Sequence, residues 1–375
     1  MAGFDFRSET RWWVSFSDLA FRSNGIAINT VRFDASDNKL GVRGRWLRSA
    51  HDENREDEQL IEPYLSTNSA SIKNGNVGSK FSRCIRSGSH TDVGGRRQNE
   101  DEHIQIDDLS MLLGDKYKRL HASSFYAIFD GHGGSEAASY VKDYTMKLFL
   151  DESNLPQAEL VDDTLLKELQ DYHRKAFLQA DKALADDRSI SDYCGTTALS
   201  VLILYNRYLI LANAGDSRAV VSRKGVAIQM SNDHRPSYLQ EKERVEKLGG
   251  YFEDGYLNGE LGVTRALGDW YMKSPNGLGS VLIAEPEMRH MELSEDDEFM
   301  IIGCDGIWIV MSNEEAVRIV RRGLLKNNDP QQCVMEIINE ALGRHAIDNL
   351  TAIVVCFTSH IEPPKAWRPK FRRAL

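Results

Sequence analysis

Two kinds of hydrophobic pattern run along the chain, and together they predict a mixture of strands and helices. Short apolar runs at residues 125–129, 299–304 and 350–357 are typical of buried strands. Longer stretches predict helices, at residues 135–151, 163–186, 238–248, 313–325 and 330–342. Because strands and helices come in clusters rather than in regular alternation, the pattern indicates an α+β domain.

Two pairs of shorter apolar runs predict hairpins. Residues 197–205 and 208–214 flank Asn206-Arg207, and residues 219–222 and 227–230 flank residues 223–225. Residues 82–89 are a further candidate strand, whereas residues 253–260 predict a polar loop. His173 lies on the helix predicted at residues 163–186, and we expect it to pack against neighbours rather than bind a ligand.

The two ends of the chain differ in composition from the middle. Residues 1–80 are rich in serine, asparagine, arginine and acids, which predicts a flexible polar extension. Trp12, Trp13 and Trp46 in this extension could dock on a partner or pack locally. The folded domain is predicted at residues 81–358. Residues 359–375 form a short basic tail, for which a solvated end and a weak targeting role both stay open.

Composition and charge restrict the class of protein. Hydrophobic residues make up 41% and charged residues 27%, as in ordinary globular proteins, and the net charge of −10 argues against a general nucleic-acid binder. The five cysteines form no CxxC pair, so we expect reduced thiols in an intracellular protein. The chain shows no membrane helix, secretory signal or myristoylation match. We expect a cytoplasmic or nuclear monomer without membrane or nucleic-acid partners.

The apolar run at residues 125–129 ends in the sequence Asp130-Gly131-His132-Gly-Gly. A carboxylate at the end of a buried strand is costly unless a charged partner meets it, and a metal ion is the strongest such partner. Gly131 lets the backbone turn and offers its carbonyl as another oxygen ligand, while His132 can act as an acid or a base. The alternative for this stretch alone is an ordinary Asp-Gly turn.

Further acids repeat this placement at strand edges. Asp305 follows the run at 299–304, and Asp348 precedes the run at 350–357, so the three acids indicate one oxygen-ligand site for Mg²⁺ or Mn²⁺. Asp216 either joins this cluster or caps its turn. Adjacent residues on a strand point in opposite directions, so Glu100 and Asp101 cannot both bind one ion directly. In a loop they could hold metal-bound waters, and a solvated acidic turn is the alternative for this pair alone.

Two arginines that stand close to acids in the sequence suggest different roles. Arg96, close to Glu100 and Asp101, suits a phosphate group because its guanidinium fork matches phosphate geometry. Arg265 and Asp269 are expected to form a structural ion pair. The chain has no Ser-His-Asp spacing, P-loop or GxGxxG turn. A carboxylate cluster with one histidine and one arginine indicates metal-assisted hydrolysis of a phosphate ester, with two cations activating a water.

Nine short motifs between residues 87 and 357 extend this interpretation. In chain order they are GGRRQNED, FDGHGG, CGTTAL, ANAGDSRAV, NDHRP, EKERVEKLGG, NGELGVTRALGD, CDGIW and DNLTAIVV. Each motif is weak alone, but in this order they resemble the metal-dependent serine/threonine protein phosphatases of type 2C. The resemblance implies a central β-sandwich of two antiparallel sheets flanked by helix pairs, with two Mn²⁺ or Mg²⁺ ions at one end and phosphoproteins as substrates.

The resemblance also implies roles for individual residues. Asp130 would bridge both metals, Gly131 would give its carbonyl to one, and Asp305 and Asp348 would hold the other. Arg96 would bind the phosphate, and His132 would protonate the leaving serine or threonine oxygen. A water between the metals would attack phosphorus in line, without a phosphoenzyme. Glu100 and Asp101 would act mostly through water, as the residues alone suggested.

The sequence departs from the family pattern at three places. Ile309 stands where the family often has an acid, which puts a third, weaker metal site shared with Asp216 in question and motivates the alternative of a binding protein with weakened catalysis. Asn99 replaces a frequent methionine. Residues 251–260 lack the tryptophan of the plant hormone-receptor-regulated branch, so we do not expect that mode of partner binding. A phosphatase for small molecules would fit the same core.

Overall fold

The computed structural model describes residues 85–113, 122–149, 162–273 and 279–361, and two short strands near the N-terminus, β1 (Arg32–Asp34) and β2 (Lys39–Gly41). The chain divides into two units, Met1–Val77 and Gly78–Leu375, and β1 pairs with β2 in an antiparallel arrangement within the first. The predictions for Trp12, Trp13, Trp46, Cys84 and residues 362–375 lie outside the described residues. The predicted domain boundaries stay predictions.

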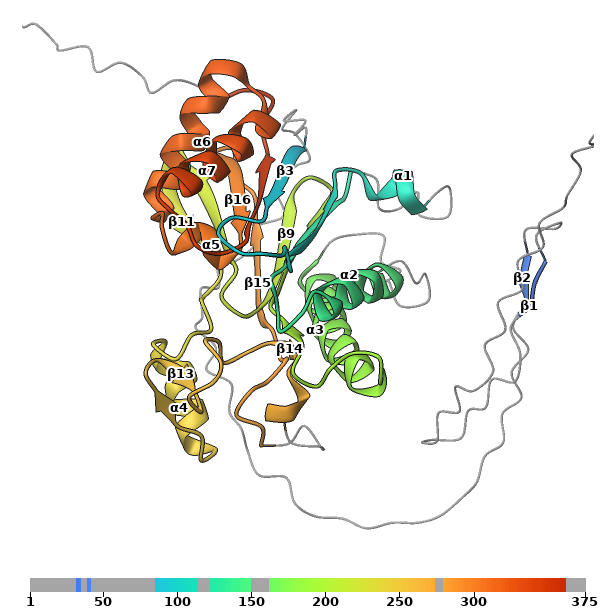
Figure 1. Ribbon diagram of the computed structural model, residues 1–375. Coiled ribbons are helices and arrows are strands. Elements are labelled where there is room, and N and C mark those ends of the chain that lie inside the picture. The colour runs from blue at the N-terminus through green and yellow to red at the C-terminus, as the bar shows by residue number, and fades with distance from the viewer. Residues whose placement is uncertain are drawn as a thin grey trace, which may run out of the picture. The chain divides into compact units, whose positions relative to one another are not determined.

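The second unit is built on two five-stranded antiparallel sheets (Figure 1). The first sheet has the strand order β11 (Val226–Gln229), β10 (Arg218–Arg223), β16 (Asp297–Gly303), β17 (Leu350–Cys356) and β3 (Arg86–Asp92). The second sheet has the order β15 (Glu287–Glu292), β9 (Tyr208–Ala214), β8 (Ala198–Leu204), β5 (Ser124–Phe129) and β4 (Glu102–Ile106).

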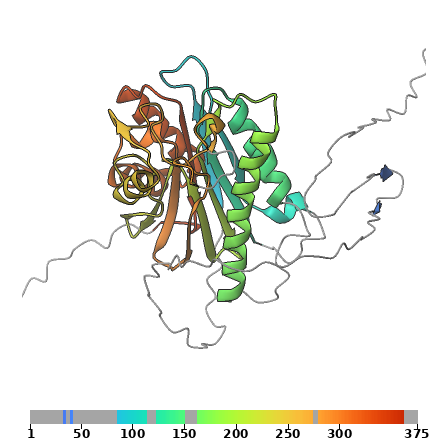
Figure 2. The same cartoon turned by 90° about the horizontal axis from the view of Figure 1, so that it is seen from below.

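Alternation of side chains along the strands produces the layers. On β5, Tyr126 and Ile128 join the core that also contains Val220 and Ile301 of the first sheet, whereas Phe125 points into a second core. In that second core the sheet packs against α2 (Glu136–Phe149) and α3 (Asp163–Asp186). On the far side, α6 (Asn313–Asn327) and α7 (Pro330–Gly343) cover the first sheet, and Figure 2 shows the four layers from below. The predicted α+β sandwich with flanking helix pairs is confirmed.

The long helices begin where local capping predicts. The Asp162 side chain accepts from the backbone N–H of Leu165 at 2.8 Å and starts α3. Ser312 and Glu315 form a capping box at the start of α6, and Pro330 follows the N-cap of α7. His173 is fully buried on α3 and bonds the Leu169 carbonyl, so its predicted packing role is confirmed.

Several short elements were not predicted from the sequence. The predicted loop at 253–260 contains part of a small antiparallel pair, β12 (Phe252–Glu253) with β13 (Tyr256–Leu257), next to α4 (Leu239–Lys247). Strand β15 has the polar sequence EMRHME and is recognisable only by its place at the edge of the second sheet. The other unpredicted elements are α1 (Leu109–Leu113), β6 (Gly131–His132), β7 (Gly195–Thr196), β14 (Leu267–Gly268), the 3₁₀ turn η2 (Trp270–Met272) and α5 (Asp305–Trp308).

Two further observations concern the described part of the chain. Four cysteines are free and buried, namely Cys194, Cys304, Cys333 and Cys356. Among the helices described there, none has both the length and the apolar character needed to span a bilayer.

Candidate active site

The strand register brings the predicted acids to one end of the sandwich. In the second sheet, Phe129 at the end of β5 pairs with Glu102 at the start of β4, so Asp130 and Asp101 are neighbours. In the first sheet, Gly303 at the end of β16 pairs with Ala352 and with Arg218. Asp305 follows β16, Asp348 precedes β17, and Asp216 precedes β10 at this same end.

Asp101 and Asp130 approach each other in the interior. Single ligand atoms of Asp101, Asp130 and Cys304 all lie within 4.8 Å of one another, and this group could hold a metal ion. Thr351 donates a hydrogen bond to Asp101 Oδ2 at 2.6 Å, which joins the acid to β17 of the other sheet. The other oxygen, Asp101 Oδ1, is buried and has no hydrogen-bond partner. A buried carboxylate oxygen without a donor is a place where a cation, or a water bound to a cation, fits.

Two arginines bind the remaining acids. Arg96 Nη2 lies 2.7 Å from Asp348 Oδ2, as expected for an arginine placed beside the cluster. Arg235 joins two acids, because its Nε donates to Asp216 Oδ2 at 2.9 Å and its Nη2 donates to Asp305 Oδ2 at 2.7 Å. The sequence argument gave Arg235 no role, although it stands in the motif NDHRP.

Asn349 fixes the loop that carries Arg96. Its side-chain NH₂ donates to the carbonyls of Val93 and Gln98, both at 2.9 Å, and its Oδ1 accepts from the backbone N–H of Glu100 at 3.0 Å. These bonds tie residues 93–100 to the start of β17. Asn349 was also missed as a positioning residue, because a single asparagine beside an acid carries no distinctive sequence signal.

Gly131 is required by the close approach of a neighbouring loop. A Cβ at this position would overlap the backbone carbonyl oxygen of Glu100, so no other residue fits without a shift of backbone. Glu100 itself is half-buried here, and its charge favours the protonated form of His132. All of the predicted site residues therefore lie at this end of the sandwich.

Negative charge is in excess at this end. Burial, followed by the charges of Asp101 and Asp305, raises the pKa of Asp130 well above its usual range. Burial and the charge of Asp216 raise the pKa of Asp305 to about 7, and burial raises the pKa of Asp101 to about 6. Among the described residues, the arginines paired with these five aspartates are Arg96 and Arg235, so divalent cations would relieve the repulsion. The oxygen-rich donor set fits Mg²⁺ or Mn²⁺.

Cys304 belongs to the wall of the site rather than to the oxygen ligands. Its Sγ donates to the Asn349 carbonyl at 3.3 Å and accepts from the backbone N–H of Thr351 at 3.1 Å. Burial and the charge of Asp101 raise the pKa of the Cys304 thiol well above its usual range. The thiolate is the form that binds metals, so the carboxylates are the better ligands here.

The predicted ion pair between Arg265 and Asp269 is wrong. Arg265 Nη2 instead donates to Glu241 Oε1 at 2.6 Å, and Asp269 Oδ2 lies 2.8 Å from His132 Nε2. The two residues are four apart on a segment without helical structure, so their spacing does not bring them together. Burial lowers the pKa of His132, but the hydrogen bond and charge of Asp269 outweigh it and the pKa lies above its usual value.

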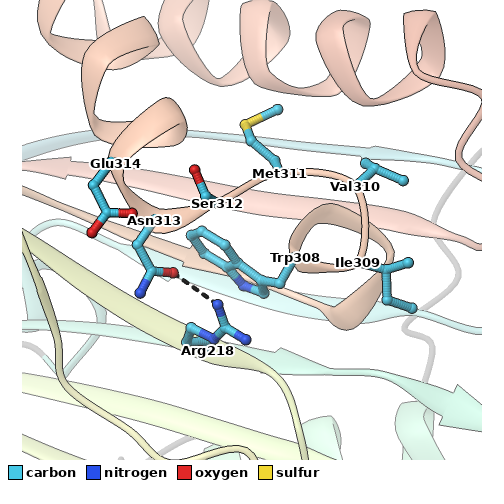
Figure 3. Close-up of a pocket in the computed structure, with 8 residues that line it drawn as sticks. All are labelled: Arg218, Trp308, Ile309, Val310, Met311, Ser312, Asn313 and Glu314. Carbon is cyan, nitrogen blue, oxygen red and sulfur yellow. Dashed lines mark hydrogen bonds between the residues drawn. The ribbon is translucent and has the colours of Figure 1, made fainter.

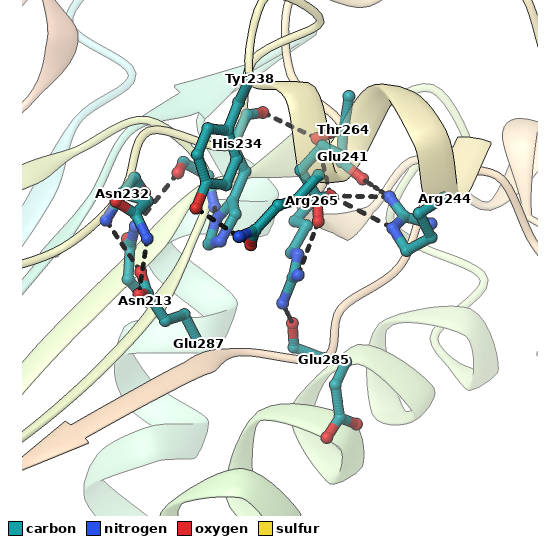
Figure 4. Close-up of polar contacts among 12 residues, drawn as sticks. Asn213, Asn232, His234, Tyr238, Glu241, Arg244, Thr264, Arg265, Glu285 and Glu287 are labelled. Atoms are coloured by element: carbon teal, nitrogen blue, oxygen red, sulfur yellow. Dashed lines mark hydrogen bonds and ion pairs between the residues drawn. The ribbon is translucent and has the colours of Figure 1, made fainter. Parts of the chain in front are cut away.

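A buried polar network holds the segment that carries Arg235 (Figure 4). His234 Nδ1 accepts from the backbone N–H of Gly215 at 3.1 Å, which fixes the turn before Asp216. The His234 carbonyl accepts from both the N–H and the hydroxyl of Thr264, at 2.7 and 3.0 Å. Glu241 of α4 accepts from Thr264 and thereby connects this segment to the small cluster around α4.

Ile309 lies one helical turn after Asp305 and donates its backbone N–H to the Asp305 carbonyl at 2.8 Å. Its side chain is 59% exposed and forms part of the lining of a shallow cavity of about 430 Å³ (Figure 3). Arg218 also lines this cavity. Its Cζ lies 5.2 Å from the centroid of the Trp308 ring, and its Nη1 donates to Asn313 Oδ1 at 2.8 Å. An apolar side chain thus stands one helical turn after Asp305, where the sequence resemblance expected an acid.

Comparison with known proteins decides the family. A profile of the family "Protein phosphatase 2C" matches residues 85–350. The chain belongs to the protein phosphatase 2C family. It is 55% identical over 286 residues to "Probable protein phosphatase 2C 47" of Oryza sativa subsp. japonica, covering 76% of this chain and 73% of that protein. It is 51% identical over 301 residues to "Probable protein phosphatase 2C 13" of Arabidopsis thaliana, covering 80% and 78%.

Solved structures of low sequence identity share the fold. A serine-threonine phosphatase 2C from Toxoplasma gondii superposes with a TM-score of 0.59 at 21% identity, covering 75% of this chain and 96% of that one. A C. elegans sex determining protein superposes with a TM-score of 0.60 at 24% identity, covering 74% and 66%. The predictions of a type 2C family member and of a serine/threonine protein phosphatase are confirmed. The protein phosphatase 2C family is metal-dependent, in keeping with the acid cluster.

Proposed function

We propose that this phosphatase removes phosphate from phosphoserine and phosphothreonine side chains by in-line attack of water, with two Mn²⁺ or Mg²⁺ ions at the strand-end acids. The convergence of five buried or half-buried aspartates from both sheets, paired with two arginines in the part of the chain that the structure describes, carries the proposal. Such an excess of carboxylates is costly in a folded protein unless cations bind it.

Each acid has a proposed place in the metal centre. Asp130, at the middle of the cluster, would contact both cations, and the Gly131 carbonyl would bind one of them. Asp305 and Asp348 would hold the other cation, while Glu100 and Asp101 would act through water. When bound, the cations would lower the pKa of a water to give the nucleophile and would neutralise phosphoryl oxygens. Ile309 makes a third cation shared with Asp216 less favourable, because it offers no oxygen.

Arg96 is the proposed phosphate-binding residue. Its side chain is 58% exposed and donates to Asp348 through one nitrogen, Nη2, so the rest of its planar fork faces outward. If Asp348 holds a cation, the Arg96 guanidinium would be free to leave that carboxylate. Arg96 would then bind two phosphoryl oxygens, which a lysine could not do with the same geometry.

His132 is the proposed donor of a proton to the leaving oxygen. It lies two residues after Asp130, and its side chain is 29% exposed. The carboxylate of Asp269 favours the protonated imidazole that this role needs. Serine and threonine alkoxides are strong bases, so their departure requires a proton.

The proposal is tested by hydrolysis of a phosphothreonine peptide with and without Mn²⁺. We expect turnover that depends on Mn²⁺ in the wild type and is lost in Asp130→Asn. The matched control is Asp297→Asn, which removes a fully buried aspartate paired with Arg223 at the other end of β16. Absence of wild-type turnover at every Mn²⁺ concentration would favour the alternative of a binding protein on the same fold.

The physiological setting is also a proposal. The acidic net charge and the free thiols of the described cysteines support a monomer that meets phosphoproteins in the cytoplasm or nucleus. Gel filtration of the purified chain tests the monomer, and microscopy of a fluorescent fusion tests the location. Concentration at a membrane, or a stable dimer, would contradict this part of the proposal.

A further inference from the structure

Asp269 is a buried acid that contacts His132 but has no place in the proposed metal centre. Its side chain is 1% exposed, and its Oδ2 lies 2.8 Å from His132 Nε2. Apart from His132, nothing in the metal centre is bonded to Asp269 among the contacts of the described residues. A buried carboxylate whose partner is the proposed proton donor suggests a role in orienting that donor.

A small three-stranded sheet brings the side chains of Asp269 and His132 together across its central strand, β7. The strand order is β14, β7, β6, with Gly268 paired to Gly195 and Gly195 paired to His132. Asp269 directly follows β14, so its carboxylate reaches His132 over position 195. A Cβ at Gly195 would overlap both Asp269 Oδ2 and His132 Nε2. The central strand therefore needs glycine at this position for the pair to form.

Helix α3 holds Asp269 in place from the other side. The side chain of Asp181 accepts from the backbone N–H of Gly268 at 2.8 Å and from Lys273 Nζ at 2.6 Å. Its carbonyl accepts from Trp270 Nε1 at 3.0 Å. These bonds fix both flanks of Asp269, which itself has a left-handed backbone with φ of 51°. These buried contacts therefore fix the position of the Asp269 carboxylate relative to His132.

We propose that Asp269 is a positioning residue that holds His132 through Nε2, so that Nδ1 faces the serine or threonine oxygen. The inference rests on the proposed function of His132. As water forms the new bond to phosphorus, the bond from phosphorus to the side-chain oxygen breaks. That oxygen keeps the electron pair and takes the proton from Nδ1. The attacking water releases one proton to solvent and the imidazole takes one up from solvent, so no net proton is gained or lost at His132.

The test compares two substrates with different leaving groups. A phosphothreonine peptide needs the proton, whereas p-nitrophenyl phosphate does not, because p-nitrophenolate is a far weaker base. For Asp269→Asn we expect kcat on the peptide to fall about 10- to 100-fold, since general acid catalysis contributes about 10²- to 10⁴-fold. We expect the loss on p-nitrophenyl phosphate to be less than about 3-fold, a selectivity that a purely structural role would not produce.

A double-mutant cycle sharpens the assignment. If Asp269 acts through His132, adding Asp269→Asn to His132→Gln costs little further peptide turnover, because the orienting contact is already gone. The control is Asp297→Asn, which removes a buried acid distant from His132 and is expected to affect both substrates equally per folded molecule. Thermal unfolding of each variant measures its folded fraction.

The outcomes separate this inference from the proposed function. Wild-type turnover with an equal loss on both substrates in Asp269→Asn, or with additive effects in the cycle, would overturn the positioning role alone. A wild type that hydrolyses neither substrate at any Mn²⁺ concentration would overturn both proposals. Selective loss on the peptide, with a non-additive cycle, would support both.

Discussion

Two regions of this molecule contain carboxylates removed from solvent, and the pKa of the carboxylate is shifted in opposite directions in the two regions. Glu241 of α4 is 2% exposed and accepts from Arg265, Arg244 and Thr264 at 2.6, 2.8 and 2.9 Å. Burial raises its pKa, but the bonds from Arg265 and then Arg244 outweigh burial and lower the pKa to about 2. Asp130 is also enclosed, but its nearest charged neighbours include other acids, and its pKa lies well above the usual range.

The difference teaches how to tell a structural carboxylate from a site that awaits a ligand. Around Glu241 two arginines more than balance one acid, so the charges are satisfied by the protein itself. Around Asp130 the protein supplies too little positive charge, and one oxygen of Asp101 is left without a donor. We infer that Glu241 stabilises the fold, whereas the acid cluster lowers the stability of the cation-free protein and serves its function.

We expect Asp130→Asn to have the largest effect, because it removes one acid of the strand-end cluster. We expect kcat on a phosphothreonine peptide to fall by about 10³-fold or more, because the cations supply several kcal/mol to the transition state. The metal-free variant should unfold at the same temperature as wild type or a higher one, since the substitution relieves repulsion among acids. Differential scanning calorimetry in EDTA measures this. A large drop in melting temperature would show that Asp130 is a structural acid after all.

For Glu241→Gln we expect the opposite result, namely a loss of stability without a loss of turnover. We expect the free energy of unfolding to fall by about 3 kcal/mol, because two arginines lose their buried counter-charge. Turnover per folded molecule should stay near wild type, since Glu241 contacts none of the strand-end acids. Urea denaturation and a parallel assay measure the two quantities. Glu246→Gln on the same helix, where the acid is 53% exposed and 3.8 Å from Lys242, is the control and should cost under about 0.5 kcal/mol. Equal losses in the two variants would refute the structural role of Glu241.

His234→Asn extends the comparison to a buried group that is neutral. Burial and then the charge of Arg265 lower the pKa of His234 to about 3, below the unfolded value of about 6.5. The unfolded chain therefore binds more protons between these pH values, and stability falls as the pH is lowered through this window. Asparagine keeps an acceptor for Gly215 N–H without titrating.

For His234→Asn we expect the slope of unfolding free energy against pH, between pH 6 and pH 4, to decrease by about 1.4 kcal/mol per pH unit. Urea denaturation across this range measures the slope. Glu241→Gln should keep the wild-type slope between pH 6 and pH 5, because Glu241 contributes pH dependence only between its folded pKa of about 2 and its unfolded value of about 4.3. An unchanged slope in His234→Asn would show that His234 titrates in the folded state as it does in the unfolded state.

Ile309→Asp is expected to have the smallest effect. The side chain is 59% exposed, so stability should change by less than about 0.5 kcal/mol. The new carboxylate lies one turn after Asp305 and adds an oxygen ligand, so we expect the Mn²⁺ titration of activity to shift or the activity to rise by a few-fold. Ile309→Asn, which is polar but uncharged, is the control. If the Mn²⁺ titrations of Ile309→Asp and wild type superimpose, residue 309 does not affect metal binding.

The sequence predicted those features that strong local patterns encode. The helix at 163–186 agrees with α3 at both ends, because its apolar spacing is continuous and Asp162 caps it. Asp130, Asp305 and Asp348 were predictable because each stands at the end of an apolar run. Strand β15 was not, because an edge strand with one polar face has no apolar run to detect.

The residues that were missed act through tertiary contacts. Arg235 is 70 residues from Asp305 in sequence, and Asn349 bonds the loop of residues 93–100 from more than 240 residues away. Asp269 reaches His132 only because β6, β7 and β14 form a sheet of two-residue strands. No periodicity in a single sequence reports such pairings. The motifs that carry the family resemblance include Arg235, Asp269 and Asn349. The resemblance, however, assigned these three residues no hydrogen-bond partner.

The most direct test is anomalous X-ray scattering from crystals of the protein soaked in Mn²⁺. The account predicts two strong manganese peaks at the end of the sandwich, within about 2.0–2.5 Å of carboxylate oxygens. Asp130 should touch both ions, and Asp305 and Asp348 should touch one. Absence of manganese between these acids at saturating Mn²⁺, or peaks confined to other acids of the surface, would contradict it.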